Sequence, residues 1–214
     1  GNLIDAFIAA SFVISVERPH STGLGGGGFL LYHEAKTKKI YAVDFRERAP
    51  LKATRDMYLD AHGQYVSTLS KEGPLAIAVP GLVKGLWEIH KKFGKLSWKK
   101  VLTPAIELAE QGFEIYSSLD IALKNKKSTL AKNPDASKIF LNSNQEPLQQ
   151  GQKLIQADLA NSLRLISEQG ASAFYSGPIA KKMISEIQKK GSYYPKQILK
   201  NIVLSGESLF MVSF

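Results

Sequence analysis

The chain has 214 residues, of which 44% are hydrophobic and 22% are charged, a balance typical of globular proteins and not of disordered ones. Lysine and arginine outnumber aspartate and glutamate by 28 to 19, so an anionic partner has to be considered. The lysines are scattered, with no aromatic platform between them, and we therefore expect a solvated basic surface and no nucleic-acid partner. No cysteine is present, which excludes disulfides, thiol nucleophiles and thiolate metal sites.

An apolar segment near the start, Leu3 to Val16, predicts a helix covered on most sides. Asn2 is a suitable N-cap, and Asp5 stands where a carboxylate favours the positive end of the helix dipole. Pro19 ends the helix, because the residue before a proline is pushed out of the helical region. The segment is shorter than the roughly 20 residues that cross a bilayer, so we expect no membrane span.

Four consecutive glycines, Gly25 to Gly28, lie between this helix and the next extended stretch. Glycine is used where a Cβ would clash or where φ must be positive, so the run predicts backbone laid close against another element. A flexible linker is the alternative, but linkers rarely continue straight into an aromatic and aliphatic strand. The pattern G-x-G-x-x-G from Gly23 to Gly28 does not indicate a dinucleotide site, because it follows a helix and opens a strand.

Two predicted strands, Phe29 to Tyr32 and Ile40 to Phe45, form a hairpin with a polar turn. The second strand brings a charged group to its end, made of Asp44, Arg46, Glu47 and Arg48. Alternation along an extended chain sends Arg46 and Arg48 to one side and Glu47 to the other. From the residues alone, Arg46 either binds an anion or pairs with Asp44 or Glu47.

The rest of the chain predicts helices with glycine caps. The expected helices are Leu82 to Phe93, Trp98 to Gln111, Ser118 to Lys132, Gln156 to Gln169 and Ile179 to Lys190. Two short apolar strands are expected, one at Leu75 to Pro80 and one at Ile139 to Leu141, after a break at Asn133-Pro134. A polar loop is expected between residues 51 and 73, and residues 192–214 receive no element.

Several ordered motifs resemble the γ-glutamyltransferase (γ-glutamyltranspeptidase, glutathione hydrolase) family. They are Gly1-Asn2 with Asp5-Ala6, Glu17-x-Pro19-His20, the glycine run to Phe29, Arg46-Glu47 before Ala49-Pro50, Val79-Pro80-Gly81 with Gly85, Pro104-Ala105, Leu108-Ala109, Gly112-Phe113 and Phe174-Tyr175-x-Gly177. The match runs in register from Gly1 to about Gly191. We therefore expect residues 1–191 to form part of a large-subunit domain, followed by an unassigned tail.

The resemblance implies an N-terminal nucleophile hydrolase: an α/β fold, part of an αββα sandwich with an outer helical lobe. Such a precursor cleaves itself into two subunits, and the threonine freed at the start of the small subunit attacks the γ-glutamyl carbonyl of glutathione or a related compound. We expect that threonine outside this chain, in a small-subunit partner, so the chain alone should not catalyse. Ser21 and Thr22 do not begin the chain, which excludes them as this nucleophile.

The resemblance also assigns site residues. Arg46 would bind the α-carboxylate of the γ-glutamyl group through a bidentate fork, and Glu47 would position Arg46 or face the pocket, unless it is a plain surface carboxylate. His20 is expected to be packed or bonded to backbone. No metal or organic cofactor is implied, and the expected location is periplasmic or secreted.

Two other functions stay open from the sequence. The first is a catalytically inactive fragment or γ-glutamyl-binding protein that keeps Arg46 but lacks the threonine. The second is a basic scaffold for anionic polymers, whose affinity would fall steeply with salt and would not depend on Arg46.

Overall fold

The computed structural model describes residues 1–51, 53–190 and 210–213, and it separates into two compact units. Unit 1 is made of Gly1–Gly23 and His90–Glu168, and unit 2 of Leu24–Ile89 and Gln169–Phe214. Each unit therefore builds its core from segments that are far apart in the sequence. Within the described residues, none of the helices combines the length and the apolar content needed to cross a membrane.

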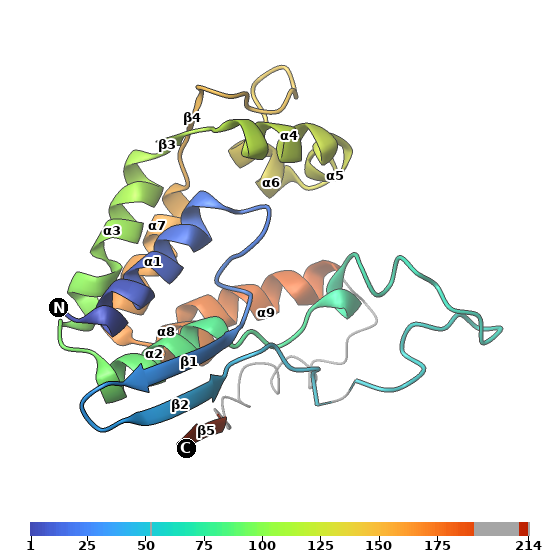
Figure 1. Ribbon diagram of the computed structural model, residues 1–214. Helices are drawn as coiled ribbons and strands as arrows, with labels where there is room; N and C mark the ends of the chain where they lie inside the picture. The colour runs from blue at the N-terminus through green and yellow to red at the C-terminus, as the bar shows by residue number, and fades with distance from the viewer. Residues whose placement is uncertain (52, 191–209, 214) are drawn as a thin grey trace. The chain divides into compact units, whose positions relative to one another are not determined.

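Three helices of unit 1 lie side by side: α1 (Leu3–Glu17), α3 (Trp98–Gln111) and α7 (Ala157–Gln169) (Figure 1). The ring of Phe12 on α1 meets the ring of Trp98 on α3 edge to face, with centroids 5.6 Å apart. The indole Nε1 of Trp98 donates a 2.9 Å hydrogen bond to the carbonyl of Ile166 on α7. These contacts hold the Trp98 side chain against both α1 and α7. The bounds of α1, α3 and α7 confirm the helices predicted from the sequence.

The start of α1 confirms Asn2 as the predicted N-cap, and Asp5, expected only to favour the helix dipole, completes a capping box. The Asn2 side chain accepts from the Asp5 backbone N–H at 2.9 Å, and the Asp5 carboxylate accepts from the Asn2 N–H at 2.7 Å. The same carboxylate also accepts from the backbone N–H groups of Lys95 and Leu96, at 2.9 and 3.2 Å, in the turn before α3. Asp5, only 3% exposed, therefore ties the first turn of α1 to a turn some 90 residues away.

The remaining part of unit 1 consists of three short helices and a two-stranded antiparallel sheet. The helices are α4 (Ser117–Asn125), α5 (Lys127–Ala131) and α6 (Pro134–Phe140), and the strands are β3 (Phe113–Glu114) and β4 (Lys153–Leu154). The lysine-rich helix expected over residues 118–132 is thus two helices. The two strands are too short to show the alternation by which a strand is recognised.

The strand predicted at Ile139 to Leu141 is wrong, because α6 continues to Phe140. The side chain of Asn133 accepts from the N–H groups of Asp135 and Ala136, at 3.0 and 3.3 Å, and Pro134 occupies the first helical turn. Asn followed by Pro is a helix start, since proline needs no N–H there. The pair that the sequence analysis interpreted as a break therefore begins a helix.

Unit 2 contains a three-stranded antiparallel sheet in the order β1-β2-β5. Strands β1 (Phe29–Glu34) and β2 (Lys39–Asp44) form the predicted hairpin, with Phe29 opposite Asp44 and Glu34 opposite Lys39. Strand β5 (Phe210–Ser213) pairs with β2 and lies in the tail to which the sequence assigned no element. The rest of that tail, residues 192–209 and 214, lies outside the described residues.

The helices of unit 2 are α2 (Leu82–Phe93), which crosses into unit 1 at its end, α8 (Ser172–Tyr175) and α9 (Pro178–Lys190). The strand predicted at Leu75 to Pro80 is wrong. Pro74 instead opens a 3₁₀ turn, η1 (Pro74–Ala76). The only strand-like pairing described for residues 75–80 is an isolated antiparallel bridge between Val79 and Arg48. The mixture of helix and strand confirms the predicted α/β class.

Candidate functional site

The segment after β2, residues 45–48, is held through its backbone from two directions in unit 2. Phe45 and Gly28 exchange hydrogen bonds of 2.9 and 3.2 Å, which continues the pairing beyond the hairpin. Arg48 and Val79 exchange bonds of 3.1 and 2.7 Å on the other flank. Because these bonds involve only main-chain atoms, the path of the segment is fixed independently of its charged side chains.

Four glycines surround Phe45, and we call them the glycine cradle: Gly27, Gly28, Gly81 and Gly85. A Cβ on Gly27 or Gly81 would lie 2.4 or 2.0 Å from the Phe45 carbonyl oxygen, and a Cβ on Gly85 would lie 2.4 Å from the Phe45 Cβ. A Cβ on Gly28 would touch the Phe45 ring at 3.0 Å. Only glycine permits such close approach. The prediction that the glycine run lies against another backbone is confirmed.

The start of α2 is attached to the same glycine run. The carbonyl of Gly26 accepts hydrogen bonds from the N–H groups of Gly81 and Leu82, at 3.0 and 2.8 Å. The first N–H groups of a helix have no partner within the helix, so a carbonyl from another segment satisfies them here. The glycine run, the segment after β2 and the start of α2 therefore form one backbone-bonded unit.

Tyr175 of α8 completes this arrangement. Its hydroxyl donates to the carbonyl of Pro80 at 2.8 Å and accepts from the N–H of Lys84, in the first turn of α2, at 3.2 Å. Burial raises the pKa of Tyr175, so the hydroxyl keeps its proton and can donate. The motif Phe174-Tyr175-x-Gly177 thus braces the start of α2.

Arg46 stands at the centre of the held segment with its side chain 55% exposed. Its backbone N–H donates to Asp44 Oδ1 at 2.9 Å, and its Nε lies 3.3 Å from Glu47 Oε2. Of the two pairings open from the sequence, the side chain makes the one with Glu47. The terminal guanidinium nitrogens of Arg46 form no hydrogen bond with the described residues.

Glu47 is less exposed than Arg46, at 24% of its side chain, and its Oε2 is buried. That oxygen accepts no hydrogen bond from the part of the chain that the structure describes, and its close neighbour is the Arg46 guanidinium. Alternation predicted that the two side chains lie on opposite sides, but both are long enough to turn back and meet. Glu47 thus lies on the Nε side of the Arg46 guanidinium.

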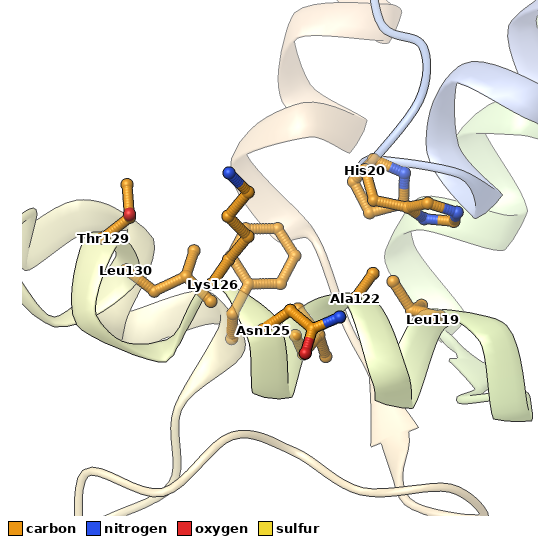
Figure 2. Close-up of a pocket in the computed structure, with 10 residues that line it drawn as sticks. His20, Leu119, Ala122, Asn125, Lys126, Thr129 and Leu130 are labelled. Atoms are coloured by element: carbon orange, nitrogen blue, oxygen red, sulfur yellow. The ribbon is translucent and has the colours of Figure 1, made fainter. Parts of the chain in front are cut away.

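His20 belongs to unit 1 and is placed differently from its prediction. It is exposed, its ring centroid lies 6.4 Å from that of Tyr116, and it lines a pocket (Figure 2). Over the described ranges, no three His, Asp or Glu side chains gather closely enough to hold a metal ion.

The comparison with known proteins decides the family. The family profile described as Gamma-glutamyltranspeptidase matches residues 1–202. The chain belongs to the γ-glutamyltranspeptidase family. It is 42% identical over 203 residues to the glutathione hydrolase proenzyme of Bacillus subtilis strain 168, a match that covers 94% of this chain and 34% of that protein. The glutathione hydrolase proenzyme of Escherichia coli K12 is 41% identical over 199 residues, with coverages of 93% and 34%.

The likeness extends to the fold. The crystal structure of Helicobacter pylori γ-glutamyltranspeptidase superposes with a TM-score of 0.88 at 36% identity, over 99% of this chain and 58% of that chain. The predicted family and its N-terminal nucleophile hydrolase fold are thereby confirmed. This chain spans about a third of the length of the curated relatives that it matches.

The roles of Gly81, Gly85 and Tyr175 were not predicted from the sequence. All three occur in the motifs that carry the family resemblance, so their residue types were in view. The motif does not say what each residue touches, since the partners are 36 to 95 positions away in the chain.

Proposed function

We propose that this chain is the large-subunit portion of a γ-glutamyltransferase or glutathione hydrolase. The whole enzyme would cleave the γ-glutamyl amide of glutathione and related compounds, and would pass the γ-glutamyl group to water or to an amino acid. Family membership supports this function, as do the relatives named glutathione hydrolase proenzyme. A small-subunit partner, outside this chain, would carry the nucleophilic threonine.

The observation that carries the proposal is the state of the Arg46 side chain. Its Nε is engaged by Glu47 at 3.3 Å, its backbone is fixed by the bond to Asp44, and its terminal nitrogens are free of hydrogen bonds to the described residues. A guanidinium presents parallel N–H donors to a carboxylate, which a lysine ammonium cannot reproduce. Arg46 would therefore bind the α-carboxylate of the γ-glutamyl group through its two terminal guanidinium nitrogens.

Glu47 would act as a positioning residue. Its buried Oε2 lies against the Nε side of Arg46 and opposes rotation of the guanidinium plane. A guanidinium held in one plane loses less conformational freedom when its ligand binds. Glu47 would thus lower the free-energy cost of orienting Arg46 without contacting the substrate.

In the reaction, the threonine oxygen would attack the γ-carbonyl carbon and the amide C–N bond would break, with the released amine taking a proton. Water or an acceptor amine would then displace the threonine oxygen and release the γ-glutamyl product. The contribution of this chain would be to hold the far end of the γ-glutamyl group, so that the carbonyl meets the nucleophile in one orientation. Loss of Arg46 should therefore weaken substrate binding first.

We further propose that the mature enzyme acts in the periplasm or outside the cell, as the family resemblance implied. The absence of cysteine in the chain is compatible with an oxidising compartment. Immunodetection in periplasmic, secreted and cytoplasmic fractions of the source cells tests this location, and a purely cytoplasmic protein would contradict it.

Kinetics of an Arg46 series test the proposed function in the complete enzyme, with γ-glutamyl-p-nitroanilide as substrate. Arg46→Lys should raise KM by about tenfold or more, because a charged bidentate hydrogen bond contributes roughly 1.5–3 kcal/mol. Arg55→Lys is the matched control, since Arg55 is 96% exposed and pairs with Asp56 in the same unit. Equal KM values for the two variants would contradict the role of Arg46.

Intact-mass analysis of the purified protein separates the enzyme from the inactive alternative. A second polypeptide that begins with threonine, together with release of p-nitroaniline, is expected for the enzyme. Binding of γ-glutamyl compounds without their cleavage would instead support the γ-glutamyl-binding protein. Affinity for polyanions that is indifferent to Arg46 would support the basic scaffold.

A further inference from the structure

Unit 1 contains an open pocket of about 480 Å³ that takes no part in the site around Arg46. It lies between the start of the loop after α1, at Pro19 and His20, and the three short helices α4, α5 and α6 (Figure 2). This volume falls within the range of small-molecule sites, roughly 300–1,000 Å³. The pocket is therefore large enough for a ligand of metabolite size.

The floor of the pocket is apolar and belongs to a hydrophobic core. Leu119 and Leu123 of α4 are 0% and 5% exposed, and they form a buried cluster with Ile115 and Leu154. Leu130 and Phe140 pack against this cluster and also line the pocket. A floor built on packed side chains keeps its shape and favours an apolar group over water.

The rim of the pocket is polar and carries a cation. Lys126, Asn125, Thr129 and His20 supply the polar atoms of the lining, and no acidic residue of the described chain is part of it. Figure 2 shows Lys126 and His20 on either side of the opening. The charge around the opening therefore favours a ligand with an anionic end.

The three neighbouring lysines of this region differ in a way that singles out Lys126. Lys124 pairs with Asp120 at 2.6 Å, and Lys127 pairs with Glu146 at 2.6 Å. Lys126, which alone among the three lines the pocket, forms no ion pair with any described carboxylate. Lys124 and Lys127 thus have carboxylate partners within the fold, whereas the Lys126 ammonium has none among the described residues.

We propose that this pocket binds a small amphipathic monocarboxylate, a medium-chain fatty acid, with its apolar chain on the floor and its carboxylate at Lys126. The Asn125 amide and the Thr129 hydroxyl are further donors in the lining of the pocket. A neutral or cationic ligand would gain no attraction from the exposed Lys126 ammonium, and a fully polar anion would leave the apolar floor uncovered. The site is separate from the proposed γ-glutamyl chemistry, so its test does not depend on activity.

Calorimetric titration of the complete protein with decanoate tests the site, with decanol as the neutral probe of the same length. Decanoate should bind, and Lys126→Met should weaken its binding by about tenfold, because one charge-assisted hydrogen bond is lost. Lys127→Met is the matched control and should change the affinity less than about twofold, since its partner Glu146 lies outside the pocket lining. Ala122→Phe, which fills the pocket from α4, should abolish binding.

Three results would overturn the proposal in protein shown by circular dichroism to be folded. The first is the absence of decanoate binding to the complete protein, by calorimetry at two temperatures. The second is equal affinity for decanoate and decanol, and the third is equal loss of affinity in the Lys126→Met and Lys127→Met variants.

Discussion

The starts of helices α1 and α2 are both tied to distant parts of the chain, but by opposite means. At α1 a buried carboxylate, Asp5, accepts N–H groups from its own helix start and from the turn that holds Lys95. At α2 the acceptors are the backbone carbonyl of Gly26 and the hydroxyl of Tyr175, and the segments that meet there approach closely at glycines, which have no Cβ. The α1 junction depends on the polar side chain of Asp5, whereas the α2 junction depends on glycines that lack a Cβ.

This difference determines how each junction should respond to change. A side-chain junction loses a defined set of hydrogen bonds when its carboxylate is replaced, and it depends on pH through that carboxylate. Substitution of a glycine at the α2 junction removes no hydrogen bond, but it adds a Cβ atom for which the neighbouring atoms leave no space. Substitutions of the closely packed glycines at α2 should therefore be more damaging than replacement of Asp5 at α1, and their effect should not depend on pH.

The largest effect is expected for Gly81→Ala. The added Cβ would lie 2.0 Å from the Phe45 carbonyl oxygen, a main-chain atom that cannot move without breaking its bond to Gly28. We expect a loss of at least about 3 kcal/mol in the free energy of unfolding, or failure to fold. Urea denaturation followed by circular dichroism measures it.

Gly25→Ala is the matched control, because no atom lies within 4 Å of a Cβ at that position of the same glycine run. Its free energy of unfolding should change by less than about 0.5 kcal/mol. If Gly81→Ala were as mild as Gly25→Ala, the close approach around Phe45 would have no energetic importance.

An intermediate effect is expected for Asp5→Asn at the α1 junction. The variant keeps the shape but weakens the bonds to Asn2, Lys95 and Leu96, which should cost about 2 kcal/mol at pH 7. Burial acts to raise the pKa of Asp5, but the three backbone N–H groups and nearby His90 outweigh it and lower the pKa below its ordinary value.

A carboxyl group with a lowered pKa stabilises the fold above the pKa of the unfolded chain, near 3.8, and loses that contribution as the pH falls through its folded value. The difference in stability between the native protein and Asp5→Asn should therefore be constant at neutral pH and shrink below about pH 4. Asp158→Asn, an exposed first-turn aspartate of α7, serves as control. A gap that does not narrow in acid would argue against a charged Asp5.

The smallest effect is expected for Tyr175→Phe. The ring stays in place, but the Pro80 carbonyl loses its donor and the Lys84 N–H loses its acceptor. A cost of about 1–2 kcal/mol follows from two partly buried groups left without partners. Thermal unfolding measures it, and an unchanged Tm would show that water replaces the hydroxyl at no cost.

The two junctions also show what the sequence could and could not predict. The N-cap of α1 was predicted from Asn2, because helix capping is local, whereas the reciprocal bond from Asn2 N–H to Asp5 was not. The glycine run predicted close packing, but its partners Phe45 and Gly81 follow only from the tertiary structure. The bonds of Asp5 to the turn before α3 were missed for the same reason.

Errors in the predicted elements have a local cause as well. Apolar residues at Leu75 to Pro80 and at Ile139 to Leu141 suggested strands, but a proline opens a turn or a helix just before each of them. In a short apolar run, the period cannot distinguish strand from helix. For Arg46, the residue type and the family motif predicted the candidate site, whereas its pairing with Glu47 required the fold.

Substrate discrimination by the complete enzyme tests the role of Arg46 most directly. Its kcat/KM for γ-glutamyl-p-nitroanilide is compared with that for 4-aminobutanoyl-p-nitroanilide, which lacks only the α-carboxylate. The native enzyme should prefer the carboxylated substrate by about 100-fold, and Arg46→Ala should reduce that preference to within about threefold, while Arg55→Ala leaves it intact. A preference that survives in Arg46→Ala would contradict the assignment of Arg46 as the carboxylate-binding residue.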